Sequence, residues 1–134
     1  MTALHLSSLT LSHFRSHKRA AVEVDARPVA IYGPNGAGKT NLIEAVSLLS
    51  PGRGMRRASA QEMTRRPEAL GWKIGAVLHG PEGVNEISVR SESGGSRQVE
   101  IDGKPAPQTA LGRIARVLWL IPVSYTHLTL PPNR

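Results

Sequence analysis

The sequence predicts an α/β domain built around a phosphate-binding loop, and three observations support this prediction. A glycine-rich octet that ends in Lys-Thr occupies residues 33–40. A short apolar run precedes the octet and a helical pattern follows it, which is the strand–loop–helix context that this motif requires. Farther along, residues 73–101 contain three short strand-like segments with turn-forming residues between and after them. These segments predict an antiparallel β-meander beside the nucleotide-binding core.

Three strands are expected before the loop. Leucines recur from residue 4 to residue 11, in a segment that ends at Phe14, and residues 21–25 alternate apolar and polar side chains as a half-buried strand does. Residues 28–32 form a short apolar run that ends at Gly33, which is typical of a buried strand. The last of these runs leads directly into the loop.

After the loop the apolar residues change to helical spacing. Leu42, Ile43, Val46 and Leu49 predict a helix that stops at Pro51 and Gly52. Residues 52–66 are basic and are expected to mix loop and helix. The meander strands are expected at 73–78, 86–90 and 98–101, with Asp-Gly turn chemistry at 102–103. A short helix over 111–118 and a strand beginning at 118–122 complete the prediction.

The octet is a Walker A motif, so ATP with Mg²⁺ is the expected ligand. Its glycines let successive backbone N–H groups point at phosphate oxygens. Lys39 is expected to reach the β- and γ-phosphates, Thr40 to ligate Mg²⁺, and the following helix to present its positive end to the same anion. The predicted nucleotide-binding residues are Gly33, Pro34, Asn35, Gly36, Ala37, Gly38, Lys39 and Thr40.

No catalytic residue can be identified in this chain. Hydrolysis needs a Walker B carboxylate and a residue that orients water, and no apolar run after the loop ends in Asp or Glu. Glu44 is interpreted as a solvated residue on the helix face rather than a catalyst. The five histidines are scattered without ligand spacing, so no further metal site is expected.

Composition adds a charge argument. Of the 17 basic residues thirteen are Arg, and the net charge is +7. This excess favours a polyanionic partner, because Arg pairs with phosphates bidentately; solubility and a GC-rich genome explain it equally well. No apolar stretch is long enough for a membrane span, no signal peptide is recognised and no cysteine is present, so a cytoplasmic protein is expected.

The residues around the loop resemble the RecF family of bacterial DNA replication and repair proteins, ABC-type ATPases grouped with the SMC-like proteins. The resemblance rests on Phe14-Arg15 before the loop, on Asn41-Leu42-Ile43-Glu44-Ala45 after it, and on Leu48-Leu49-Ser50-Pro51-Gly52-Arg53. It covers about residues 6–123 and implies the N-terminal part of an ABC-type ATPase head.

This resemblance implies ATP-dependent binding of single-stranded or gapped DNA, recombinase loading in the SOS response, other recombination-mediator proteins as partners, and an ATP-dependent homodimer with weak DNA-stimulated hydrolysis. It places Asn41 and Arg15 beside the nucleotide, although Arg15 as an ordinary surface residue is an equal alternative. A basic cluster is a candidate DNA contact, with a solvated face or contacts within the head as the alternative; its members are Arg53, Arg56, Arg57, Arg65 and Arg66.

The chain departs from the family pattern near its end. The helical lobe, signature motif and Walker B of the family are not found, and the resemblance ends at Val123. We therefore expect a partial head over residues 1–123 and a non-family tail over 124–134. This tail looks like translated adapter sequence, with a genuine divergent tail as the alternative. Two other functions stay open: the ATPase subunit of an ABC transporter, and a non-catalytic DNA-binding module with a vestigial loop.

Overall fold

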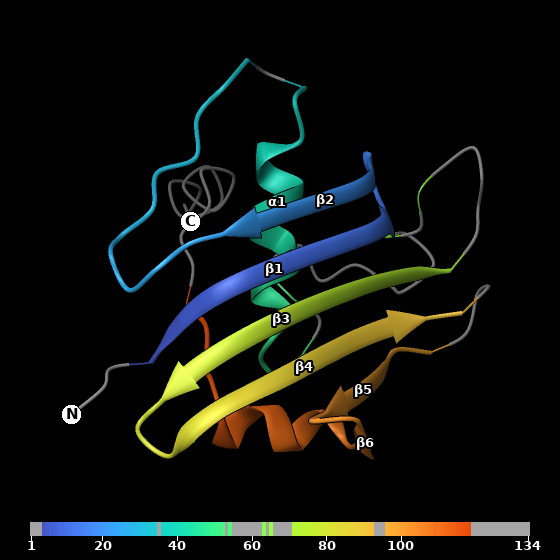
Figure 1. Ribbon diagram of the computed structural model, residues 1–134. Coiled ribbons are helices and arrows are strands. Elements are labelled where there is room, and N and C mark those ends of the chain that lie inside the picture. Colours follow the sequence, from blue (N-terminus) through green and yellow to red (C-terminus); the bar gives the residue numbers. More distant parts are fainter. Residues whose placement is uncertain are drawn as a thin grey trace, which may run out of the picture.

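Six strands form one antiparallel sheet in the order β2-β1-β3-β4-β5-β6 (Figure 1). The computed structural model describes residues 4–34, 36–52, 54, 63, 65, 71–92 and 96–118. The elements are β1 (His5–Phe14), β2 (His17–Glu23), α1 (Lys39–Ser47), β3 (Trp72–Gly80), β4 (Gly83–Ser91), β5 (Gln98–Ile101), β6 (Lys104–Ala106) and the 3₁₀ helix η1 (Gln108–Arg113).

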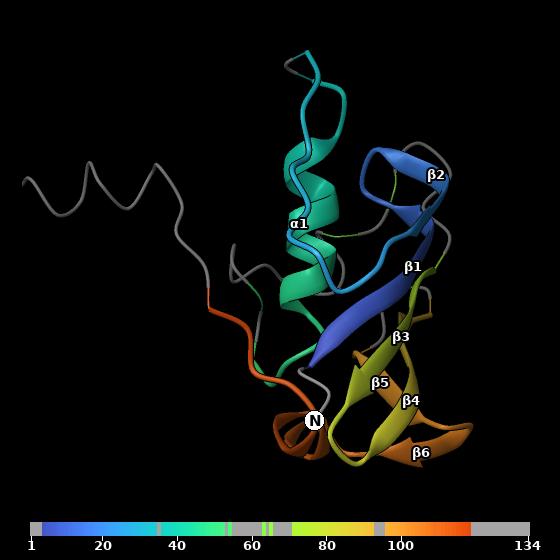
Figure 2. The same cartoon turned by 60° about the vertical axis from the view of Figure 1, so that its left-hand side comes forward.

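One face of this sheet carries the core. Along β3 the residues Trp72, Ile74, Ala76 and Leu78 are buried and alternate with more exposed residues, as the two-residue period of a strand requires. The helices α1 and η1 lie on the same side of the sheet (Figure 2), and both contribute buried side chains to one apolar cluster. That cluster fixes α1, and with it the residues before α1, against the strands.

The meander was predicted because its signals are local. The expected strands at 73–78, 86–90 and 98–101 correspond to β3, β4 and β5, which pair with one another in the expected order. Asp102 and Gly103 connect β5 to β6 with φ angles of 53° and 84°. Two successive positive φ angles are typical of the tight hairpin turn that an Asp-Gly pair favours. The three-residue strand β6 was not predicted.

The strand predicted at residues 28–32 was wrong. No strand occurs between Glu23 and α1 in the described residues, and Val29, Ile31 and Tyr32 are exposed, Tyr32 to 92%. The apolar pattern of this segment is that of a buried strand, but a strand forms only where a neighbour accepts its hydrogen bonds. Among the described residues, no backbone hydrogen bond joins residues 28–32 to a neighbouring strand. The last such bond before the loop runs from Val24 N–H to the Ser7 carbonyl at 3.0 Å.

The helices differ from expectation in two details. Helix α1 ends at Ser47, and Leu48 and Leu49 continue as a buried turn toward Pro51. The helix expected over 111–118 is the short 3₁₀ helix η1, which begins after Pro107; Leu118 is 96% exposed. Most of the strand expected at 118–122 lies outside the described residues.

Candidate phosphate-binding site

The phosphate loop leads into helix α1 through two residues in left-handed conformations. Gly36 has φ 87° and Gly38, the N-cap of α1, has φ 95°, angles that L side chains rarely adopt. No side chain caps α1 and no acidic residue lies in its first turn. The N-terminal N–H groups and the positive end of the helix dipole are therefore left for an anion. Asn35 lies outside the described residues.

Lys39 bends back over the loop that it terminates. Its ammonium donates to the carbonyl oxygens of Gly33 at 2.5 Å and Pro34 at 2.8 Å, while Ala37 N–H donates to Pro34 at 3.2 Å. These bonds hold the ammonium against the backbone at the start of the loop. Thr40 follows at the exposed start of α1. Lys39 thus contacts Gly33, and the binding of nucleotide by Gly33, Gly38, Lys39 and Thr40 stays a prediction.

Glu44 was interpreted incorrectly as a solvated helix residue. Its side chain is completely buried, and Arg15 forms a bidentate ion pair with it: Nε lies 2.5 Å from Oε1 and Nη2 lies 3.1 Å from Oε2. A carboxylate on the buried face of a helix requires such a partner, because an unpaired charge is costly to bury. Arg15 is 22% exposed, and a direct role at the nucleotide stays a prediction.

The turn between β1 and β2 lies against the start of α1, a contact that sequence reasoning missed. Asn41 Nδ2 donates to Ser16 Oγ at 2.6 Å, and His17 Nε2 lies 3.0 Å from the carbonyl oxygen of Gly38. With the pair between Arg15 and Glu44, three consecutive residues, two in the turn and one at the start of β2, bind the start of α1. Arg15 of the Phe-Arg element therefore helps to fix α1, the helix that follows the loop. No sequence motif indicated that His17, two residues after Arg15, contacts the loop.

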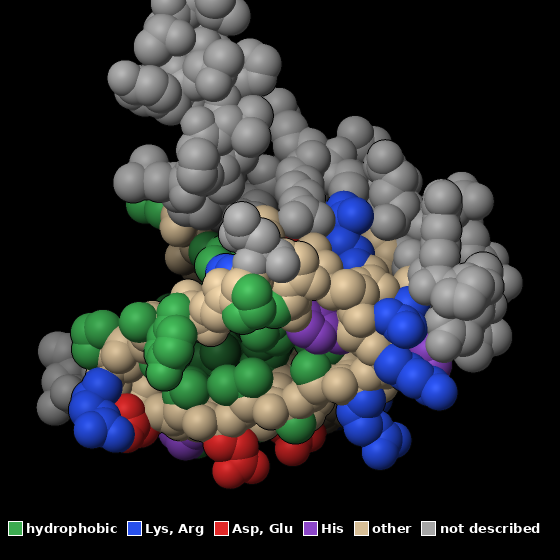
Figure 3. Space-filling view, turned by 90° about the horizontal axis from the view of Figure 1, so that it is seen from above, with side chains coloured by type: hydrophobic (Ala, Val, Ile, Leu, Met, Phe, Trp, Pro, Cys, Tyr) green, Lys and Arg blue, Asp and Glu red, His purple; other side chains and the backbone are tan. Residues whose placement is uncertain are grey.

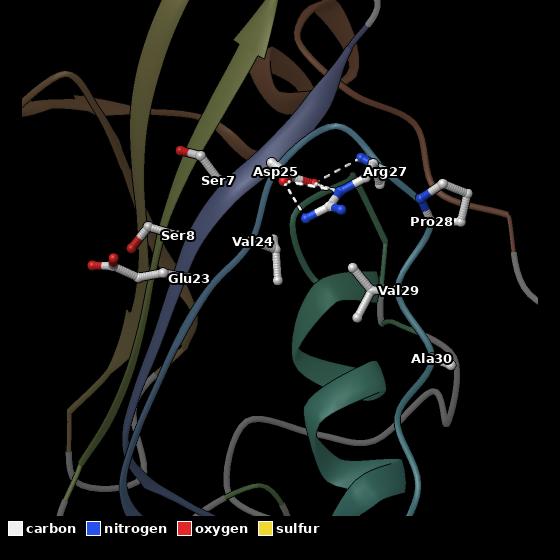
Figure 4. A pocket seen from close by; sticks show the side chains of 9 residues that line it. All are labelled: Ser7, Ser8, Glu23, Val24, Asp25, Arg27, Pro28, Val29 and Ala30. Carbon is white, nitrogen blue, oxygen red and sulfur yellow. Dashed lines mark hydrogen bonds and ion pairs between the residues drawn. The ribbon is translucent and has the colours of Figure 1, made fainter.

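A hollow of the described surface is lined by residues outside the phosphate loop. From above, hydrophobic side chains gather around a hollow (Figure 3), and a space of about 820 Å³ is lined by Ser7, Ser8, Glu23, Val24, Asp25, Arg27, Pro28, Val29 and Ala30. Figure 4 shows Val24 and Val29 on two sides of it and Asp25 joined to Arg27. Hydrogen bonds from Arg27 lower the pKa of Asp25 below its ordinary range. No loop residue lines this hollow.

Of the predicted DNA-contacting cluster, only Arg65 lies within the described residues; Arg53, Arg56, Arg57 and Arg66 lie outside them. Arg65 Nη1 donates to the Ser16 carbonyl at 2.6 Å, and its backbone N–H donates to His13 at 3.1 Å. For Arg65 this contact within the domain agrees with the alternative interpretation, and a DNA contact stays a prediction. Burial lowers the pKa of another arginine, Arg97, whose guanidinium donates to Gln108.

Comparison with known proteins decides the family. The sequence profile of the RecF/RecN/SMC N terminal domain matches residues 5–121. The chain belongs to the RecF/RecN/SMC N-terminal domain family. Among curated proteins, the DNA replication and repair protein RecF of Rhizobium etli is 49% identical over 122 residues, which are 87% of this chain and 32% of that relative. The chain thus spans about a third of that relative's length, and the predicted resemblance to RecF is confirmed.

Solved structures of this family confirm the predicted head fold. The structure of the recombination mediator protein RecF-ATP superimposes with a TM-score of 0.73 at 25% identity, over 84% of this chain and 30% of that chain. A structure from work on ATP-driven dimerization of SMC ATPases has a TM-score of 0.78 at 17% identity and covers 96% of this chain and 93% of that one, which shows the fold alone. The chain has the N-terminal part of an ATPase head with a β-meander.

Two expectations concern the chain as a whole. None of the helices among the described residues has the length and apolar character that crossing a membrane requires. The expected boundary between residues 1–123 and 124–134 falls outside the residues that the structure describes.

Proposed function

We propose that this chain binds Mg²⁺·ATP through residues 33–40 and belongs to a DNA replication and recombinational repair protein. The observation that carries the proposal is the uncapped start of α1 behind two left-handed glycines, with the Lys39 ammonium over the loop. The similarity to the DNA replication and repair protein RecF of Rhizobium etli supports the process, and the similarity to the structure of RecF-ATP supports the ligand. In this proposal Lys39 contacts the β- and γ-phosphates and Thr40 ligates Mg²⁺.

Calorimetric titration of the chain with Mg²⁺·ATP tests this assignment. Lys39→Ala should weaken binding by at least about 100-fold, because charge-assisted hydrogen bonds contribute roughly 1.5–3 kcal/mol each and two phosphates lose one. Lys73→Ala, which removes an exposed lysine from β3, is the matched control and should leave the affinity unchanged. Thr40→Ala should bind ATP nearly equally with Mg²⁺ or EDTA. Equal affinities of Lys39→Ala and the original chain, at equal circular dichroism, would refute the proposal.

We also propose that the longer protein binds single-stranded or gapped DNA, loads recombinase with other mediator proteins, and forms an ATP-dependent homodimer. The net charge of +7 and the arginines of residues 53–66 support a phosphate-led, sequence-independent contact. Counterion release then predicts a log–log salt slope of about −0.7 per neutralised phosphate of single-stranded DNA. Binding that does not change between low and moderate salt would contradict this mode.

A paired substitution locates the DNA surface. Arg56→Glu with Arg57→Glu should weaken DNA binding. The control pair Lys104→Glu with Arg113→Glu, in β6 and η1, makes the same change in net charge and should weaken binding less. Equal losses in both pairs would place the contact elsewhere. A DNA affinity that ATP does not alter would favour the alternative of a binding module with a vestigial loop.

A further inference from the structure

The turn between β1 and β2 is tightly constrained beside the phosphate loop. Phe14 and His17 face each other across the two strands, so Arg15 and Ser16 form the turn itself, and Arg15 has φ 49°. Two later residues also bind the turn. Arg15 N–H donates to the Met63 carbonyl at 2.9 Å, and Arg65 Nη1 donates to the Ser16 carbonyl at 2.6 Å. The imidazole of His17 is therefore presented to the loop from a fixed backbone.

The contact between His17 and Gly38 has a defined donor. A carbonyl oxygen can only accept, so the hydrogen bond of 3.0 Å requires a proton on His17 Nε2. The same carbonyl accepts the first N–H bond of α1, from Leu42 at 3.2 Å. A β-carbon on Gly38 would lie 2.6 Å from His17 Nε2 and 2.8 Å from Ser16 Oγ. Glycine is thus needed here both for its φ of 95° and for the approach of the turn.

The orientation of this carbonyl determines the direction of a phosphate-facing N–H. The carbonyl of Gly38 and the N–H of Lys39 belong to one planar trans peptide and point in opposite directions. With the carbonyl bound to Leu42 and His17, the Lys39 N–H must point out of the N-terminus of α1. That is the direction from which helix N-termini bind phosphate.

We propose that His17 is a positioning residue of the phosphate loop, which holds the peptide between Gly38 and Lys39 so that its N–H faces the nucleotide. The inference rests on the proposed nucleotide binding. The turn then contributes to ligand affinity as well as to packing. The contribution to affinity comes from the hydrogen bond that His17 Nε2–H donates to the Gly38 carbonyl.

Three substitutions separate this role from packing. His17→Phe keeps a ring and removes the donor, and His17→Gln restores an N–H donor on a flexible side chain. His79→Phe is the matched control, because His79 Nε2 lies 2.9 Å from Ser7 Oγ on the sheet, away from the loop. His17→Phe should weaken Mg²⁺·ATP binding by about 3- to 10-fold, the usual worth of one hydrogen bond. His17→Gln should recover most of the affinity, and His79→Phe should not change it.

Amide hydrogen exchange of the chain without nucleotide provides a second, independent measurement. His17→Phe should accelerate exchange at Leu42 and the neighbouring loop amides and leave the sheet amides unchanged. Unaltered exchange and affinity, or acceleration spread over the whole sheet, would overturn the proposal, the latter by showing general destabilisation. If the original chain binds no ATP, the proposed function fails, and the exchange pattern alone then decides whether His17 holds the loop.

Discussion

Removing Arg15 from its ion pair with Glu44 should destabilise the fold strongly. Arg15→Met keeps the length of the side chain but leaves a fully buried carboxylate without its guanidinium. Removing one member of a buried pair costs about 3–5 kcal/mol in general. Because Arg15 is 22% exposed and water screens part of the interaction, we expect about 2–3 kcal/mol here.

Urea unfolding followed by circular dichroism measures this loss. With a typical slope of about 1–3 kcal/mol per molar urea, a loss of about 2–3 kcal/mol should lower the midpoint by about 0.7–3 M. The double variant Arg15→Met with Glu44→Gln removes both charges and should recover much of the loss, so that the substitutions are non-additive by about 1–2 kcal/mol. The exposed pair between Arg27 and Asp25 is the control: Arg27→Met should give no measurable shift.

Two results would refute the reasoning. One is an Arg15→Met midpoint equal to that of Arg27→Met, and the other is strict additivity in the double variant. If Arg15→Met does not fold at all, the double variant still decides, because without either charge no uncompensated carboxylate stays buried.

The remaining predictions concern packing, pH and hydrolysis. Gly71→Ala should cost about 1–3 kcal/mol in urea unfolding, because its β-carbon would lie 2.4 Å from the Ser91 carbonyl oxygen, whereas Gly80→Ala, with 3.6 Å to its nearest neighbour, should be nearly neutral; equal effects would contradict this. Hydrogen bonds from Glu86 N–H and Asn85 lower the pKa of Asp102, so its contribution is present above the unfolded pKa and is lost as pH falls through the folded pKa. The free energy of unfolding should therefore fall less steeply between about pH 5 and 2 in Asp102→Asn than in the original chain. Parallel pH curves of the two proteins would show that the Asp102 carboxylate does not contribute to this pH dependence. The chain alone should not turn over ATP, because no Walker B carboxylate follows the loop, while a version extended through its natural reading frame should; steady phosphate release by the chain alone would show that the ABC-type assignment is wrong.

The parts of the fold that the sequence predicted are those with local causes. The Walker A octet, the start of α1 and the Asp-Gly hairpin each depend on a few neighbouring residues, and β3, β4 and β5 follow one another along the chain. The strand predicted at residues 28–32 was wrong because a strand needs a partner strand, and an apolar pattern does not show whether one is present. The pattern of that segment predicted burial, and exposed Val29 and Tyr32 show that burial depends on a neighbour as well.

The sequence predicted the phosphate loop of the candidate site but not the contacts that the β1–β2 turn makes with α1 and Gly38. On α1 Glu44 was interpreted as solvated, but it is buried, whereas Ile43, one of the apolar residues that predicted the helix, is 44% exposed. The reversal comes from Arg15, which is 29 residues earlier in the chain and becomes a neighbour only when β1 and β2 pair. His17 was missed for the same reason, since its partner Gly38 is 21 residues away.

The position of β3 beside β1 also determines how the chain must fold. Leu11 pairs with Ile74, so the phosphate loop and α1 lie inside a closed loop of roughly 60 residues. Closing so long a loop costs chain entropy before stabilising contacts form. The hairpins of β3 to β6 close over a few residues, so their entropy cost is smaller. The meander should thus form early and the nucleotide site late. Trp72 packs edge-on against Phe14 across these strands, with ring centroids 5.4 Å apart, so its fluorescence in a Trp119→Phe variant reports that closure. A Trp72 signal that appears together with meander formation would contradict this order; a delayed one would mean that ATP can act as a ligand only after the slowest step of folding.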